Sequence, residues 1–310
     1  MAEAATARPA SVPFTGDGRE PVNWTPWLLL LPVAVSLGAV SVYPILNGFW
    51  LSLTNTSLAE QRADFVGFAN YAALWSDDLF WNAWRHTMLF TFVSTLLETL
   101  IGLGMALLLH ERFFGRSFIR AAVLVPWAMP TVVTSKMFGW LFDGQHGLVN
   151  WILRSAGLID QNINWYGSVD NALGTIIVAD VWKTAPFMAL LLLAGLQTIP
   201  RSLIEAARMD GASAWTTFWH VRLPLLSTTL LIAGLFRALD AFRIFDLVYV
   251  LTGGGPADST ETLSTLSYKV LFSTLQFGYG STLSSAMFIT EAIIALVFGI
   301  FIARRMRARG

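Results

Sequence analysis

The chain has 310 residues, of which 55% are hydrophobic and only 13% charged, and its formal net charge is zero. A soluble domain of this size carries about a quarter of its residues as charged groups, so much of this surface is expected to face lipid. The neutral balance gives no electrostatic basis for binding nucleic acid. The absence of cysteine excludes disulfides, thiolate metal sites and cysteine nucleophiles.

The first 26 residues are rich in Ala, Pro, Thr and Gly and have no apolar periodicity, so we expect residues 1–26 to be a disordered tail. The apolar run that follows is too long for a signal peptide and has no small-residue cleavage site. A helix needs about 20 mostly apolar residues to cross a bilayer core of about 30 Å. Six stretches within one membrane domain, residues 27–304, meet this requirement: 27–51, 86–110, 117–142, 171–196, 223–251 and 282–303. The predicted fold is an all-α membrane protein with six transmembrane helices.

The basic residues outside these spans are distributed unequally between the two sides of the membrane. Four fall in the loops of one side: Arg62, Arg85, Arg154 and Lys269. Twelve fall on the other: Arg8, Arg19, Arg112, Arg116, Arg120, Arg201, Arg208, Arg222, Arg304, Arg305, Arg307 and Arg309. Because cytoplasmic loops carry the excess of Lys and Arg, both termini are predicted to be cytoplasmic, including a short basic tail at residues 305–310.

The loop between the fourth and fifth spans, residues 200–220, has the sequence pattern of two short helices. Ser202 followed three residues later by Glu205 is a capping box, which predicts that a helix begins there. Gly211 suits the left-handed conformation that ends a helix, and Ser213 suits the N-cap of a second one. We expect a helix-turn-helix held against the cytoplasmic ends of the spans. The alternative is an ordinary amphipathic helix lying on the headgroups.

Charged residues lie inside several predicted spans, where each costs about 2.5–3.5 kcal/mol on insertion scales unless it has a partner or a water-filled cavity. They are Glu98, Lys136, Asp180, Lys183 and Glu291, with a denser group in the fifth span consisting of Arg237, Asp240, Arg243 and Asp246. Spacing of three residues places Asp240, Arg243 and Asp246 on one face of a helix. Two interpretations stay open: these charges line a solute pathway, or they pair with each other, with Lys183 or with Asp180 to hold the helices together.

Enzymatic motifs are missing from the sequence. No Walker-type phosphate-binding loop occurs, so the chain is not expected to hydrolyse ATP itself. His110 and Glu111 begin like a zinc-protease helix, but Phe114 stands where the second histidine would be. No Gly-x-Ser-x-Gly nucleophile elbow is present. We therefore expect neither an active site nor a cofactor on this chain.

The predicted cytoplasmic loop resembles the "EAA" loop of binding-protein-dependent importer permeases. The segments that carry the resemblance are Glu205-Ala206-Ala207, Asp210-Gly211-Ala212, Phe218 and Leu223-Pro224-Leu225. In that family the loop is a coupling helix that sits in a groove of a cytoplasmic ATPase. The resemblance implies that Glu205, Ala206, Ala207, Asp210, Gly211 and Ala212 are the ATPase-coupling residues.

Further segments are similar to the maltose- and trehalose-type carbohydrate permeases of the same family. They are Phe65-Val66-Gly67-Phe68-Ala69-Asn70-Tyr71, Trp140-Leu141-Phe142, Gly147-Leu148-Val149-Asn150 and Leu251-Thr252-Gly253-Gly254-Gly255-Pro256. The resemblance extends from about residue 27 to the end. This chain lacks the additional spans and the large external insertion of the best-known maltose permease subunit, which favours the smaller six-span type.

The resemblance implies a permease subunit of an ATP-driven sugar importer in a bacterial cell membrane, forming half of the translocation pathway. The implied partners are a second homologous permease, two copies of a P-loop ATPase that bind ATP and Mg, and an extracytoplasmic solute-binding protein. The candidate pathway residues are Asp240, Arg243, Phe242, Trp182 and Lys183, although the family uses amides and aromatics where this chain has charges. An ion-coupled secondary transporter or a membrane scaffold are the alternatives. The sequence does not identify the sugar.

Overall fold

A computed structural model of the chain describes residues 25–111 and 113–307. The predicted disordered tail, residues 1–26, lies outside this part except for Thr25 and Pro26, which begin a helix. Regular structure in the described residues is helical, and only two isolated β-bridges occur there, both between residues 54 and 65. The all-α fold class is thus confirmed.

The chain divides into two compact units, and the first ends at Asn47. Its helices are α1 (Thr25–Leu37) and the π-helical turn η1 (Gly38–Val42), and α2 (Tyr43–Ser52) begins in it. Together these form an apolar span over Leu28–Ser52, long enough to cross a membrane. Pro32 lies inside α1, as transmembrane helices tolerate.

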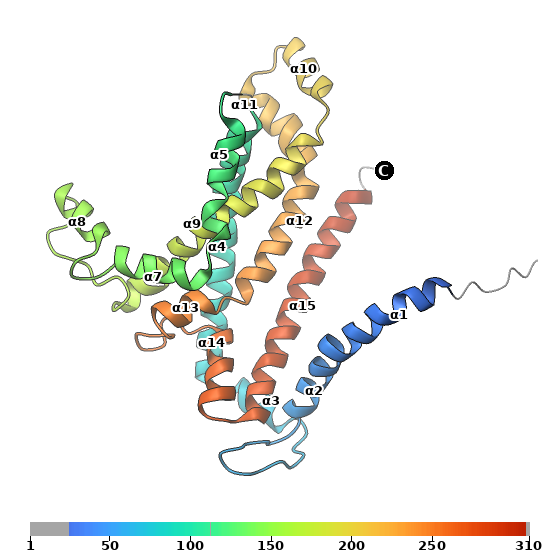
Figure 1. The fold of residues 1–310 in the computed structure, drawn as a ribbon, viewed down its shortest axis with the longest axis vertical. Helices are drawn as coiled ribbons and strands as arrows, with labels where there is room; N and C mark the ends of the chain where they lie inside the picture. Colours follow the sequence, from blue (N-terminus) through green and yellow to red (C-terminus); the bar gives the residue numbers. More distant parts are fainter. Residues whose placement is uncertain (1–24, 112, 308–310) are drawn as a thin grey trace, which may run out of the picture. The chain divides into compact units, whose positions relative to one another are not determined.

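The second unit, from Gly48 onward, is a helical bundle (Figure 1). Its long helices are α4 (Asp78–His110), α9 (Val169–Gln197), α12 (Leu223–Phe242) and α15 (Phe277–Arg307). The most extensive packing is between α4 and α9, and α12 packs against α4, α9 and α15. The shorter elements around them are α3 (Ala69–Trp75), α8 (Leu148–Ser155), α10 (Arg201–Met209), α11 (Ala214–Thr217), η2 (Phe218–Arg222), α14 (Leu263–Tyr268) and η3 (Lys269–Ser273).

The second span begins eight residues earlier than the apolar pattern predicts, at Asp78 instead of residue 86. Asp77 is its N-cap, and the Asp77 carboxylate accepts a hydrogen bond from the backbone N–H of Leu79 at 2.9 Å. A capped first turn lets the helix extend beyond the apolar segment.

The third span is not one continuous helix. It consists of α5 (Arg116–Val123), α6 (Val125–Ala128) and α7 (Thr131–Leu141), and the two halves meet at 88° across Met129 and Pro130. Met129 is extended (φ −71°, ψ 138°), because the ring of a following proline disfavours the helical conformation. Five helices in the described residues could therefore cross a membrane, or six if this bent pair is one span.

The fifth predicted span, residues 223–251, lies within one candidate membrane span, Ala214–Leu251, but its α-helix is interrupted. α12 ends at Phe242, and α13 (Asp246–Leu251) begins after three non-helical residues. Phe242 is buried in a cluster formed with α3, α4, α14 and α15. Ala241 before the interruption and Leu247 and Val248 after it are buried together in a second cluster with α4, α7 and α9.

Glycines allow the long helices to approach closely. A Cβ at Gly102 of α4 would lie 2.8 Å from Met188 Cγ on α9, and one at Gly195 of α9 would lie 2.6 Å from Thr229 Cγ2 on α12. Real Cβ atoms do not approach other atoms so closely, so any larger residue would push these helices apart. Small residues at such contacts are the usual means of packing helices in membranes.

Candidate functional site

A polar pocket of about 410 Å³ lies where α9, α12 and the α12–α13 interruption meet. Its charged lining residues are Asp180, Lys183, Arg237, Asp240, Arg243 and Asp246. Three of the five predicted pathway residues, Lys183, Asp240 and Arg243, are among them. Although the helix is interrupted after Phe242, Asp240, Arg243 and Asp246 still border one pocket, as their spacing predicts.

Arg237 is the centre of a buried ion cluster beside this pocket. Its guanidinium donates hydrogen bonds to Glu98 of α4 (Nη2 to Oε1, 2.9 Å), to Asp180 of α9 and to Asp240 one turn along α12 (Nη1 to Oδ2, 2.6 Å). The exposed fractions of Glu98, Asp180 and Arg237 are 0%, 3% and 3%. Thr184 also donates to Glu98 Oε1 at 2.7 Å. One arginine thus joins three helices through three carboxylates.

Two other charged side chains face the pocket with different partners. The Arg243 Nε lies 3.2 Å from Oε1 of Glu291 on α15 and donates to the backbone oxygen of Leu239. The Lys183 ammonium donates to the backbone oxygen of Trp127 at 3.5 Å and forms no ion pair with any described residue. Of the three basic side chains that line the pocket, Lys183 is thus the one without an acidic partner among the described residues.

The two predicted aromatic pathway residues lie elsewhere. Phe242 is completely buried in the apolar cluster that includes Phe80, Leu263 and Leu283, so a solute cannot reach its ring in this conformation. Trp182 is 40% exposed and packs against Phe138 of α7 with 5.4 Å between ring centroids. It does not line the polar pocket.

Sequence reasoning named Glu98 and Arg237 as charges inside spans but did not recognise their joint role. The partners considered for Asp240 and Arg243 were each other, Lys183 and Asp180, whereas Asp240 pairs with Arg237 and Arg243 with Glu291. The available signal was the need of each intramembrane charge for a counter-charge, together with the three-residue spacing of Arg237 and Asp240 on one helix face. The distances from Glu98 and Asp180 to Arg237 are 139 and 57 residues along the chain, and spacing cannot reveal such pairs.

The predicted coupling loop forms two short helices, α10 and α11, at one end of the bundle, away from α3 and α14 (Figure 1). Gly211 ends α10 with φ +82°. The amide of Gly211 donates to the oxygen of Arg208 at 3.0 Å, and the amide of Ala212 donates to that of Ala207 at 2.9 Å. This is the hydrogen-bond pattern of a Schellman C-cap, as the sequence predicts.

The start of α11 agrees with the prediction from the sequence, and the start of α10 does not. Ser213 caps α11 by accepting from the backbone N–H of Thr216 at 3.2 Å, as expected. The capping box expected at Ser202 does not form, because α10 begins one residue earlier, at Arg201, and its N-cap is Pro200. The fixed backbone of proline starts the helix, so Ser202 is already inside the first turn.

The helix-turn-helix exposes both apolar and charged groups. Leu203, Met209, Trp215 and Trp219 have exposed fractions of 44%, 88%, 71% and 46%. Glu205 is exposed and forms no ion pair or side-chain hydrogen bond with any residue that the structure describes. Ile204 alone of the α10 side chains packs onto the apolar cluster beneath. An exposed patch of large apolar side chains marks an interaction surface.

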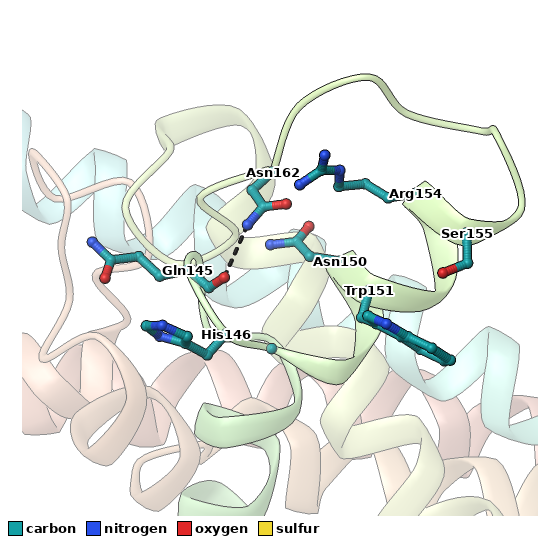
Figure 2. Close-up of a pocket in the computed structure, with 8 residues that line it drawn as sticks. Gln145, His146, Asn150, Trp151, Arg154, Ser155 and Asn162 are labelled. Atoms are coloured by element: carbon teal, nitrogen blue, oxygen red, sulfur yellow. Dashed lines mark hydrogen bonds between the residues drawn. The ribbon is translucent and has the colours of Figure 1, made fainter.

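A second pocket, of about 530 Å³, lies on the loop between α7 and α9 and includes α8 (Figure 2). Buried Asn150 organises it: its amide donates to the oxygen of Ile163 at 2.9 Å and accepts from the N–H of Ile163 and from the Trp165 indole. The side-chain amide of Asn162 donates a hydrogen bond of 2.9 Å to the backbone oxygen of Gln145, drawn as a dashed line in Figure 2. Asn150 is fully engaged and therefore serves the loop's structure.

Asp143 fixes the start of this loop. Its carboxylate accepts hydrogen bonds from the backbone N–H of His146 at 2.7 Å and of Gln145 at 2.9 Å, and these bonds lower the pKa of Asp143 below its ordinary value. A Cβ at Gly147 would collide with the Asp143 backbone. Tight local packing therefore requires a glycine at position 147.

Three relatives of known type align with most of this chain. A trehalose/maltose transport system permease protein, MalF of Thermococcus litoralis, is 41% identical over 272 residues, covering 88% of this chain and 91% of the relative. A sulfoquinovosyl glycerol transport system permease of Agrobacterium fabrum is 38% identical, covering 91% and 94%. The trehalose transport system permease SugA of Mycobacterium tuberculosis is 40% identical, covering 88% and 86%.

Two solved structures have a similar fold. One is a bacterial ABC transporter involved in the import of the acidic polysaccharide alginate, with a TM-score of 0.78, 19% identity and coverage of 91% of this chain and 96% of that one. The other is the bacterial alginate transporter in complex with an alginate pentasaccharide-bound periplasmic protein, with a TM-score of 0.75, 21% identity and coverage of 92% and 94%. At these identities the likeness concerns the fold.

The family of binding-protein-dependent transport system inner membrane components matches residues 98–308, from Glu98 of the ion cluster to the end of α15. The matched region includes the polar pocket and the helix-turn-helix of α10 and α11. With relatives at about 40% identity over nearly nine-tenths of its length, the chain belongs to the permease subunits of binding-protein-dependent ABC importers.

Proposed function

We propose that this chain is the membrane-spanning subunit of an ATP-driven sugar importer and forms half of its translocation pathway. The observation that carries the proposal is the exposed helix-turn-helix at one end of a helical bundle whose interior contains a polar pocket. The permeases that align with most of the chain transport trehalose, maltose or sulfoquinovosyl glycerol by name. A sugar or sugar derivative is therefore the substrate class.

The exposed helix-turn-helix supports a coupling role for Glu205, Ala206, Ala207, Asp210, Gly211 and Ala212. The Schellman cap at Gly211 gives the turn a fixed shape, and the exposed apolar side chains around it offer a surface to a cytoplasmic ATPase. ATP and Mg bind to that partner. When the ATPase dimer closes, the docked turn moves with it, and the two permeases rock between inward- and outward-facing states.

The assembly we propose contains a second homologous permease, two copies of the ATPase and an extracytoplasmic solute-binding protein. A neighbour of similar fold is described in complex with a loaded periplasmic protein. The chain would lie in the bacterial cell membrane with both termini in the cytoplasm, because twelve basic residues fall on that side and four on the other.

We assign Lys183, Asp240 and Arg243 to the solute pathway, with Trp182 near it. All three charged side chains border the polar pocket, and their donors and acceptors suit sugar hydroxyls. Phe242 is omitted from this proposal, because its ring is buried among apolar side chains.

An ion-coupled secondary transporter fits this chain less well. Such a transporter needs carboxylates that are free to bind an ion, but Glu98 and Asp180 are both held by Arg237, and Glu291 is paired with Arg243. In the described ranges no group of three or more His, Asp or Glu side chains could hold a metal ion. The family membership also favours ATP-driven import.

A matched pair of variants tests the coupling role. Gly211→Val and Gly157→Val each place a β-branched residue at a left-handed glycine that ends a short helix, with φ of +82° and +67° and open space around both. The strain is about 1–2 kcal/mol in either case. In proteoliposomes containing the partner subunits, we expect Gly211→Val to abolish uptake and substrate-stimulated ATP hydrolysis, and Gly157→Val to retain both.

A charge reversal provides the second test. We expect Glu205→Lys to prevent productive coupling while the chain still inserts, and Asp160→Lys, an exposed change in the α8 loop, to have little effect. Normal uptake by both Gly211→Val and Glu205→Lys would contradict the coupling role. Uptake that follows an ion gradient without any ATPase would contradict the importer itself.

A further inference from the structure

A groove of about 540 Å³ lies between the start of α12 and the end of α15. Its walls are apolar and come from both helices: Leu223, Leu230 and Leu231 of α12 and Phe301 of α15. Phe301 is 55% exposed. The proposed function uses neither this groove nor any of these side chains.

Two arginines, Arg304 and Arg305, border the same groove. Both side chains are exposed. Within residues 25–111 and 113–307 neither forms an ion pair with an acidic group. The Arg305 Nε donates to Ser227 Oγ across the groove at 2.9 Å, which holds this guanidinium against α12. The remaining nitrogens of both guanidiniums are free to bind an anion.

The position of the groove along the helices fixes its depth in a membrane. α15 has 31 residues and α12 belongs to a 38-residue helical stretch, and both are apolar enough to cross a bilayer. The arginines stand in the last turn of α15. They therefore lie at headgroup level, and Leu230, Leu231 and Phe301 lie about one turn deeper, at the level of acyl chains.

We propose that this groove binds one anionic phospholipid, whose phosphate pairs with Arg304 and Arg305 and whose acyl chain lies on Leu230, Leu231 and Phe301. Apolar walls alone would suit any lipid, but two unpaired guanidiniums at the headgroup end select a negative charge. Arginine binds phosphate oxygens through paired N–H groups, and basic pockets between transmembrane helices are known sites for acidic headgroups. The proposal does not depend on which solute the chain transports.

Native mass spectrometry of the full chain with its co-purifying subunits tests this site. The probes are phosphatidylglycerol and phosphatidylcholine with identical acyl chains, mixed equally in the nanodisc or detergent from which the protein is released. We expect phosphatidylglycerol to be retained preferentially, and the double variant Arg304→Gln/Arg305→Gln to lower that preference by about tenfold or more. Arg307→Gln, on the same helix but outside the groove, should change it by less than about twofold.

A second variant separates a shaped site from general surface charge. Leu231→Trp fills the groove without changing any charge, so it should reduce phosphatidylglycerol retention while Arg304 and Arg305 remain. Equal retention of the two lipids by the unaltered protein would overturn the proposal. So would an equal loss with Arg307→Gln, or efficient cross-linking of an Arg304→Cys variant to another protein segment in the membrane.

Discussion

The Arg237 guanidinium donates hydrogen bonds to carboxylates on three helices, those of Glu98, Asp180 and Asp240. Its single positive charge can balance the negative charge of only one of them. Glu98 and Asp180 are almost fully buried, whereas the Asp240 side chain is 70% exposed to the polar pocket. Removing one partner of a buried ion pair leaves an uncompensated charge, which destabilises a protein far more than the pair stabilises it. The cluster is therefore a point at which a single substitution affects α4, α9 and α12 together.

We predict that Arg237→Gln lowers the free energy of unfolding by about 3–5 kcal/mol. Thermal unfolding of the purified chain in a mild detergent measures this change. The control is Arg243→Gln, because the Arg243 side chain is 61% exposed and an exposed pair contributes about 1 kcal/mol or less. Adding Glu98→Gln to Arg237→Gln should recover part of the loss. Equal destabilisation by Arg237→Gln and Arg243→Gln would show that the cluster does not act as described.

At the scale of elements, helix packing in this bundle depends on where its glycines stand. Gly102 and Gly104 are both inside α4, so their effects on helix propensity are the same. A Cβ at Gly102 would lie 2.8 Å from Met188 Cγ and 3.0 Å from the backbone nitrogen of Ala189, whereas a Cβ at Gly104 would meet nothing within 4 Å. Two glycines two residues apart thus have opposite structural roles.

We predict that Gly104→Ala raises the free energy of unfolding by up to about 1 kcal/mol, because alanine favours the helix. Gly102→Ala gains the same propensity but forces α4 from α9, and we expect a net loss of about 1–3 kcal/mol. Denaturation of the two variants in parallel measures the difference. Equal stability of the two variants would mean that the α4–α9 contact adjusts without cost.

The sequence predicted an element well where residues of that element itself set its ends. Apolar length located the spans, and the chemistry of Gly211 and Ser213 located the end of α10 and the cap of α11. It failed at the breaks inside spans. The interruption after Phe242 contains no proline or glycine that would mark it in the sequence. The bend at Met129 and Pro130 had a visible signal in Pro130, but tolerance of proline in other spans, as at Pro186 in α9, made that signal ambiguous.

At the scale of the whole molecule, the polar pocket and the predicted coupling loop are formed by different elements. Lys183, Asp240 and Arg243 border the pocket, and α10 and α11 lie at the end of the bundle (Figure 1). The composition of the pocket was predictable from charges inside spans. The pairing of Glu98 with Arg237 was not, because it joins segments far apart in the chain.

We predict that Lys183→Gln weakens solute recognition without preventing ATPase docking. Losing a hydrogen bond from a charged donor costs about 1.5–3 kcal/mol, so the KM for uptake should rise about tenfold or more. Uptake by proteoliposomes and co-purification of the ATPase are measured on the same preparation. Lys136→Gln, a basic residue of α7 outside the polar pocket, is the control. An unchanged KM for Lys183→Gln would exclude this side chain from the pathway.

The ion cluster also constrains how the protein is made. Glu98, Asp180 and Arg237 follow one another along the chain, so α4 and α9 are synthesised before the residue that neutralises them. Until α12 emerges, the nascent protein carries Glu98 and Asp180 in apolar segments without Arg237. A chain interrupted before Arg237 therefore lacks the guanidinium that pairs with both carboxylates in the complete protein.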